Sequence, residues 1–170
     1  MRFGQAVAAC FRKYVTFSGR ASRPEYWWFV LFVILCSIVS SILDGVVFGF
    51  GTDDEPSSEV FHKIVSLGTF LPLLAAGWRR MHDTGRSGWY LLLPLLATVV
   101  IFAALMLGVA GFADSASSGE EAVQRAAESG LGLGVLVIGG LIQLVLTVLV
   151  LWWLTRPTEP AENAYGPAPV

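Results

Sequence analysis

Four long apolar runs divide this chain, and each of them is long enough to cross a lipid bilayer. They occupy about residues 26–50, 60–78, 89–112 and 131–154. A hydrocarbon core about 30 Å thick needs roughly 20 apolar residues in a helix, so the runs predict four transmembrane helices. Only 14% of the residues are charged, whereas a soluble domain is about a quarter charged. We therefore expect an all-α, polytopic membrane protein whose residues 26–154 form one four-helix bundle, with no second globular domain.

Basic residues are concentrated on one side of the expected membrane. Nine of the eleven Lys and Arg residues fall in the leader 1–25, the link 79–88 and the tail 155–170. The other two links carry Lys63 and Arg125 and are acidic. Short loops rich in Lys and Arg stay in the cytoplasm, so both termini are expected to be cytoplasmic. All six tryptophans lie near the same side, where their amphipathic rings favour the headgroup level.

The segments that flank the bundle have their own patterns. In residues 3–15, apolar side chains recur at spacings of three and four, which predicts an amphipathic helix. A basic amphipathic helix beside a membrane is expected to lie in the interface. The tail 155–170 is rich in proline, so it should be extended or turn-rich rather than helical.

Two polar segments, residues 19–28 and 78–89, meet the expected membrane at one depth. Arginine presents a planar donor fork that suits phosphate. The candidate residues for binding an anionic lipid headgroup are Arg20, Arg23, Arg79, Arg80 and Arg86, framed by Trp27, Trp28 and Trp89. The competing interpretation is structural: Glu25, Asp83 and His82 would pair within the cluster and lock the hairpin. Both interpretations remain open from the residues alone.

The sequence gives little support to catalysis, to a metal or cofactor, or to nucleic acid as a partner. His82 and Asp83 are adjacent, and adjacent side chains on a helix point about 100° apart, so they do not form a dyad as neighbours. The other histidine, His62, falls on the opposite side, and no Cys/His ligand set exists. The net charge of −2 argues against nucleic acid. We expect a protein that is not an enzyme. An enzyme that acts on an amphiphile through His82 and Asp83 is the third hypothesis.

Transport is the second hypothesis. Asp44 lies near the outer end of the first run and Gln143 near the middle of the fourth, and polar groups inside a membrane often mark a pathway. Pro72 and Pro94 lie inside the second and third runs, where each is expected to kink its helix. Four spans leave little room for a pathway, so a transporter or channel subunit would work as an oligomer. Ser37, Ser41, Gly45 and Gly49, each four apart, could supply internal packing or a homodimer seam.

The two polar segments, together with Asn163-Ala-Tyr165-Gly166-Pro167 in the tail, resemble the domain-of-unknown-function 805 family of bacterial inner-membrane proteins. The resemblance covers nearly the whole chain, and the run from His82 to Trp89 is its most specific part. It implies an integral protein of the inner (plasma) membrane. It implies no established activity or ligand, so it transfers no catalytic residue. The leading hypothesis is a non-enzymatic membrane protein that organises anionic lipid headgroups or docks a partner protein.

Overall fold

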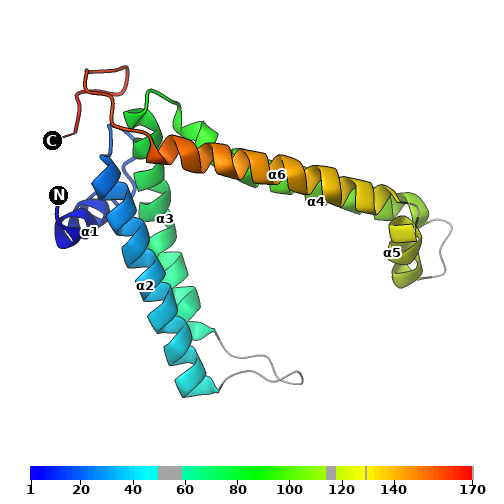
Figure 1. The fold of residues 1–170 in the computed structure, drawn as a ribbon. Helices are drawn as coiled ribbons and strands as arrows, with labels where there is room; N and C mark the ends of the chain where they lie inside the picture. Colours follow the sequence, from blue (N-terminus) through cyan, green and yellow to red (C-terminus); the bar gives the residue numbers. More distant parts are fainter. Residues whose placement is uncertain (50–58, 114–117, 129, 170) are drawn as a thin grey trace. The chain divides into compact units, whose positions relative to one another are not determined.

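The computed structural model describes residues 1–49, 59–113, 118–128 and 130–169, and all the regular elements in these ranges are helices (Figure 1). Four of them are long and apolar enough to cross a membrane, as the sequence predicts. The predicted end of the first span at Phe50, and the acidic residues Asp53, Asp54, Glu55 and Asp114, lie outside the described residues. The chain divides into two compact units, Met1–Gly88 with Leu154–Val170, and Trp89–Trp153. That all four spans form one bundle stays a prediction.

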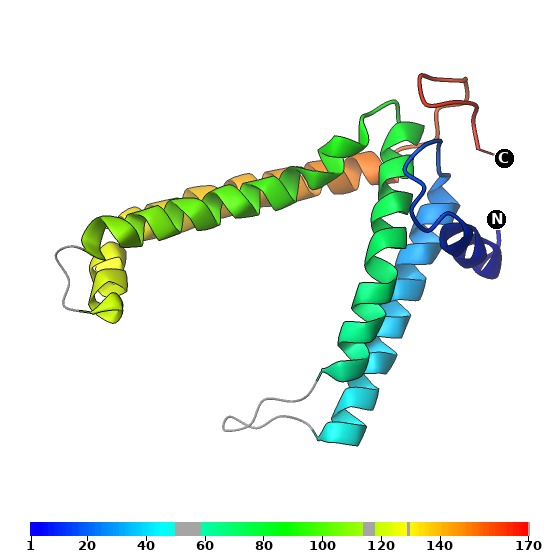
Figure 2. The ribbon, with the colours of Figure 1, turned by 180° about the vertical axis from the view of Figure 1, so that it is seen from behind.

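The first unit contains α1 (Phe3–Arg12), α2 (Arg23–Phe48) and α3 (Val60–Asp83). Helices α2 and α3 run side by side as a hairpin (Figures 1 and 2). Ser22 begins α2 because its hydroxyl accepts a hydrogen bond from the Glu25 N–H at 3.4 Å. Pro24 follows in the first turn, where a missing N–H costs nothing.

Helix α1 packs on this hairpin through its small face, on which Ala6, Ala9 and Cys10 are buried. Cys10 contributes to the apolar core with Phe29 and Ala76 of the other two helices. Burial, with the nearby Glu25 carboxylate adding to it, raises the pKa of the Cys10 thiol to about 12. The helix ends at Arg12 rather than at the predicted Val15, and the Tyr14 hydroxyl instead donates to the Gly68 carbonyl of α3 at 2.7 Å.

Helix α3 is longer than the sequence predicts. It continues past Trp78 and includes Arg79, Arg80 and the residues up to Asp83, which the sequence assigned to a link. These arginines remain helical because they bind partners inside the protein rather than water. The turn that follows is closed when the Thr84 and Arg86 N–H groups donate to the Met81 carbonyl. Gly85 adopts a φ of +71°, which glycine adopts without strain.

Asp44 stabilises the far end of the same hairpin. Its two carboxylate oxygens accept hydrogen bonds from the N–H groups of Phe61 and His62, each at 2.8 Å. These N–H groups belong to the first turn of α3, where a helix has no internal acceptor for them. A negative charge is also favoured at a helix N-terminus. The buried Asp44 therefore acts as an N-cap supplied by the neighbouring helix.

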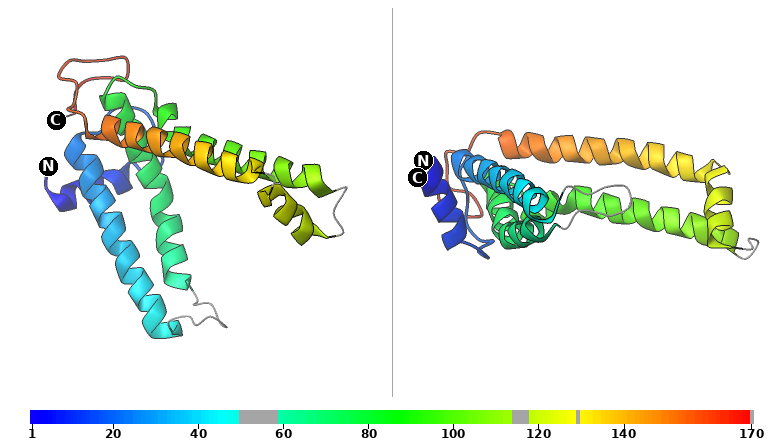
Figure 3. Two further views of the ribbon diagram at one scale, coloured as in Figure 1. Left: turned by 45° about the vertical axis from the view of Figure 1, so that its right-hand side comes forward. Right: turned by 90° about the horizontal axis from the view of Figure 1, so that it is seen from below.

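The second unit contains η1 (Gly88–Leu92, whose first residue belongs to the first unit), α4 (Leu93–Ala113), α5 (Gly119–Glu128) and most of α6 (Leu131–Thr155). Helices α4 and α6 run side by side, with α5 across one end (Figure 3). They approach closely at Gly139, where a Cβ would lie 2.7 Å from Ile101 Cγ1. The prediction that Pro94 lies in a helix interior is wrong: α4 begins at Leu93, so Pro94 occupies the first turn and frees no interior carbonyl.

Candidate functional site

Five charged side chains are buried at the end of the first unit. Arg79 is 1% exposed, and Arg80 and Asp83 are 0% exposed. With Arg20 and Glu25 they form what we call the arginine cluster, which has three positive and two negative formal charges and so a net charge of +1. Buried charges are stable only when paired and hydrogen-bonded. The cluster therefore depends on the acceptors that surround it.

Arg20 joins α3 to the tail. Its Nε and Nη2 atoms both lie 3.0 Å from Asp83 Oδ1. Its Nη1 donates to the backbone carbonyls of Ala161 at 2.8 Å and Gly166 at 3.2 Å, and its Nη2 donates to that of Glu159. One guanidinium therefore holds a carboxylate and three carbonyls of the tail.

Arg80 caps the C-terminus of α6. Its Nε donates to the Leu154 carbonyl at 3.1 Å and its Nη2 to the Arg156 carbonyl. The last carbonyls of a helix have no internal donors, and a cation there is also favoured by the helix dipole. The remaining Nη1 forms an ion pair with Asp83. Asp83 thus accepts from Arg80 and Arg20 at once.

Arg79 fastens the segment that follows α1. Its Nη2 pairs with Glu25 Oε1 at 3.2 Å, while its Nη1 donates to the Thr16 carbonyl at 2.6 Å and the Lys13 carbonyl at 3.3 Å. Its own backbone carbonyl accepts from the Ala21 N–H at 3.1 Å. The leader is therefore tied to α3 at two places.

The tail folds back onto the cluster, a point that the sequence left open. The Tyr165 ring stacks on His82 with centroids 3.8 Å apart and planes 6° from parallel. Asn163 Nδ2 donates to the His82 carbonyl at 3.0 Å, and Asn163 Oδ1 accepts from the Tyr165 N–H at 3.0 Å. The Glu159 N–H donates to the Asp83 carbonyl at 3.2 Å. The tail motif thus closes the end of α3.

The residues proposed from the sequence divide into two groups. Arg20, Arg79 and Arg80 direct their donors at protein acceptors, and Glu25 and Asp83 pair with them, as the structural interpretation expects. Arg23, Trp27 and Trp28 are exposed, and Arg86 is partly exposed. Trp89 is exposed in the second unit. A headgroup-binding role stays a prediction and fits the exposed group better.

His82 and Asp83 are not directed at each other. The His82 ring nitrogen Nδ1 lies 3.1 Å from the Gly19 carbonyl, and the Asp83 carboxylate is held by two arginines. Among the described residues, no group of three His, Cys, Asp or Glu side chains could hold a metal ion. In α6 the buried Gln143 Oε1 has no hydrogen-bond partner in the described part of the chain.

Sequence reasoning missed the acceptors that the tail supplies. Most are backbone carbonyls, which carry no residue-type signal. Glu159, Asn163 and Tyr165 carry such a signal, and the motif Asn163-Ala-Tyr165-Gly166-Pro167 stood out, but its target could not be deduced from spacing. Gly85 offers another late clue, since a Cβ there would lie 2.5 Å from Glu159 Oε1.

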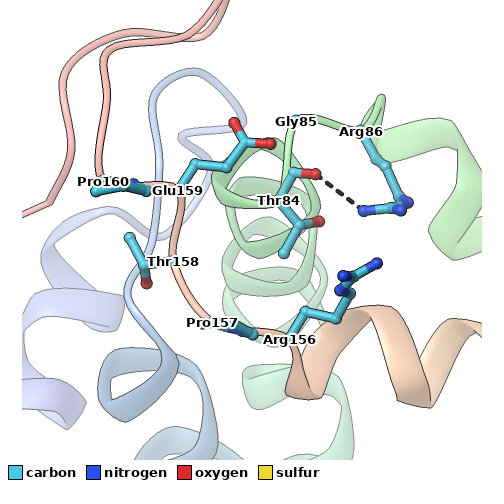
Figure 4. Close-up of a pocket in the computed structure, with 8 residues that line it drawn as sticks. All are labelled: Thr84, Gly85, Arg86, Arg156, Pro157, Thr158, Glu159 and Pro160. Atoms are coloured by element: carbon cyan, nitrogen blue, oxygen red, sulfur yellow. Dashed lines mark hydrogen bonds between the residues drawn. The ribbon is translucent and has the colours of Figure 1, made fainter.

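Two concave surfaces lie next to the cluster. A groove of about 430 Å³ is lined by Arg23, Pro24, Trp27, Trp28 and Leu31 of α2. A second pocket, also of about 430 Å³, lies between the turn after α3 and the first residues of the tail (Figure 4). Both surfaces carry arginine and neither includes a buried arginine of the cluster.

Comparison with known proteins identifies the family. The model of the family described as "Protein of unknown function (DUF805)" matches residues 14–167. The Escherichia coli K12 protein named "Inner membrane protein YhaH" is 39% identical over 85 residues, which cover 50% of this chain and 68% of that protein. "Inner membrane protein YhaI" of the same strain is 40% identical over 93 residues, covering 53% and 73%. No solved structure matches. With four helices that can span a membrane, this chain belongs to the DUF805 family, whose two matched relatives are inner membrane proteins.

Proposed function

We propose that this protein is a non-enzymatic membrane protein that holds anionic phospholipid headgroups on its arginine-rich side. The observation that carries the proposal is the groove in which Arg23 stands above Trp27, Trp28 and Leu31. A phospholipid presents the same sequence of chemistry, an anionic phosphate followed by apolar chains. The occupant that fits is therefore a single anionic phospholipid.

The spacing along α2 supports this assignment. Eight residues separate Arg23 from Leu31, which corresponds to about 12 Å along a helix. Arginine at one end can bind phosphate bidentately, and tryptophan rings favour the headgroup level. The Trp27 ring is also fixed in place, since its Nε1 donates to the Leu154 carbonyl at 3.3 Å. A fixed wall lowers the entropy that a bound lipid must lose.

The arginine cluster serves this function by keeping the surface rigid. Its charges are satisfied within the protein, so they need no ligand for stability. Catalysis through His82 and Asp83 gains no support, because their side chains are occupied by Gly19, Tyr165 and two arginines. The proposed role is that of a scaffold for lipid, and any protein partner or homo-oligomer would meet a surface that lipid already shapes.

We also propose that both termini face the cytoplasm, where anionic headgroups would meet the arginines. The excess of Lys and Arg in the leader, the 79–88 segment and the tail supports this orientation. In a cysteine-free background, Ala168→Cys should react with a membrane-impermeant maleimide only after cell lysis. Ser118→Cys, in the segment before α5, should react in cells whose outer membrane alone is permeable. The reverse pattern would contradict the orientation.

Native mass spectrometry of protein released gently from its own membrane tests the lipid groove. A basic residue near an anionic surface contributes about 1 kcal/mol, or about fivefold in affinity. Arg23→Ala should therefore reduce retained phosphatidylglycerol about fivefold. Arg12→Ala is the matched control, because Arg12 is exposed on α1 and its loss removes the same charge.

The two variants separate a site from a general field. A loss confined to Arg23→Ala would support a groove that binds one lipid. Equal losses in both variants would show that only total charge matters, and unchanged retention in Arg23→Ala would contradict the proposal.

A further inference from the structure

The pocket between the turn after α3 and the tail has a composition unlike that of the lipid groove. It is lined by Thr84, Gly85 and Arg86 on one side and by Arg156, Thr158 and Glu159 on the other. Its volume of about 430 Å³ lies within the range of about 300–1,000 Å³ typical of small-molecule sites. It is walled by polar and charged groups, so an apolar chain is a poor occupant.

Arg86 and Arg156 bring two positive charges to this one pocket (Figure 4). The one lining carboxylate, Glu159, lies against Gly85, and its Oε2 accepts from Asn163 Nδ2 at 2.8 Å. The lining therefore has two positive and one negative formal charge, or +1. Two guanidinium groups at one site favour an anion, and their donor forks match phosphate oxygens.

We propose that this pocket binds a phosphate ester, with Arg86 and Arg156 on the phosphate and the Thr84 and Thr158 hydroxyls available to the group it is attached to. The volume is generous for phosphate alone, which points to an esterified phosphate. The same chemistry is offered by a soluble phosphomonoester and by the headgroup of a phospholipid. This site goes beyond the groove at Arg23 and does not depend on it.

The pocket exists only while the tail is closed on α3. One wall follows α3 directly, and the other is the tail segment that the Glu159 N–H joins to the Asp83 carbonyl. Arg20 holds the next part of that tail at the Ala161 and Gly166 carbonyls. A ligand that bridges the walls therefore binds the closed tail only, and by linkage it stabilises that closure.

The experiment uses the full-length protein in nanodiscs. In phosphatidylcholine discs, glycerol 3-phosphate is titrated by calorimetry, and in a parallel arm the discs contain phosphatidylglycerol. Hydrogen exchange at the Glu159 and Gly166 amides is followed in both arms. The variants are Arg86→Gln, Arg156→Gln and the pair together, with Arg12→Gln as the matched control. Arg156→Gln keeps the backbone carbonyl that Arg80 binds.

We expect one or both probes to bind the protein and to slow exchange at the two tail amides. Each single Arg→Gln change should weaken binding about tenfold or more, since each removes charge-assisted hydrogen bonds. Arg12→Gln and Arg23→Ala should bind as the unchanged protein does, which distinguishes this site from the groove. Binding of glycerol 3-phosphate identifies a soluble ester, and a response only to phosphatidylglycerol identifies a headgroup.

The proposal is overturned if neither probe binds, or if the double variant binds and protects the tail as well as the unchanged protein. The Tyr165–His82 stack reports folding, because loss of tail protection before any ligand is added would show a damaged variant. In that case the single variants decide, and an affinity that neither of them lowers also overturns the site.

Discussion

Asp83→Asn tests the arginine cluster most directly. The change keeps the size of the side chain but removes the negative charge that accepts from both Arg20 and Arg80. The formal charge of the cluster rises from +1 to +2, with Asp83 itself 0% exposed. Removing one partner of a buried ion pair costs about 3–5 kcal/mol. We expect a loss in the free energy of unfolding within that range.

The second unit offers a matched control. Arg125 and Glu121 form an ion pair on α5 whose side chains are 40% and 34% exposed. Partly exposed pairs contribute about 0–1 kcal/mol, so Glu121→Gln should change stability little. The assay is reversible unfolding in mixed detergent micelles, with proteolysis of the tail as a second readout. If Asp83→Asn costs no more than Glu121→Gln, the cluster does not hold the fold and this reasoning is refuted.

Three further predictions follow from other contacts. Replacing Tyr165 with alanine removes an aromatic stack worth about 0.5–1.5 kcal/mol, so exchange at the tail amides should rise while the α2–α3 hairpin remains protected. Because burial raises the pKa of Cys10 to about 12 from 9.0, its thiol should resist maleimide at pH 8 until the protein unfolds. The stability that the protonated thiol supplies is present below pH 9 and is lost as pH rises toward 12, which a comparison with Cys10→Ala measures. Gly88→Ala would overlap the Trp78 indole and should cost about 1–3 kcal/mol, whereas Gly108→Ala, with open space around it, should cost nothing measurable.

The spans were predictable because a long apolar run has few alternatives to a helix in lipid. Their boundaries were less so. Arg79 and Arg80 indicated a loop when read as charged residues, yet they continue α3 because buried acceptors replace water. Asp44 suggested a pathway when read alone, and its role as an N-cap depends on the position of Phe61 and His62 across the hairpin.

The candidate site was predictable only in outline. The arginines and aromatic rings stood out by type and by their common depth. Which of them are buried depends on the tail, since Arg20 is satisfied by carbonyls of Glu159, Ala161 and Gly166. Every residue has a carbonyl, so no sequence pattern marks these acceptors. The exposed remainder, with Arg23 and Arg86, is where ligand binding is now expected.

Closure of the cluster by the tail also sets the order in which this protein can mature. Arg20 and Asp83 leave the ribosome long before the carbonyls of residues 159–166 that complete their hydrogen bonds. Until the tail is made, the arginines must stay hydrated at the membrane surface, because burying them without acceptors is costly. Synthesis of the tail is therefore the step that lets the first hairpin reach its final state. A chain stopped before Glu159 would insert its spans but keep an open, protease-sensitive end, so quality-control proteases could distinguish finished from unfinished copies.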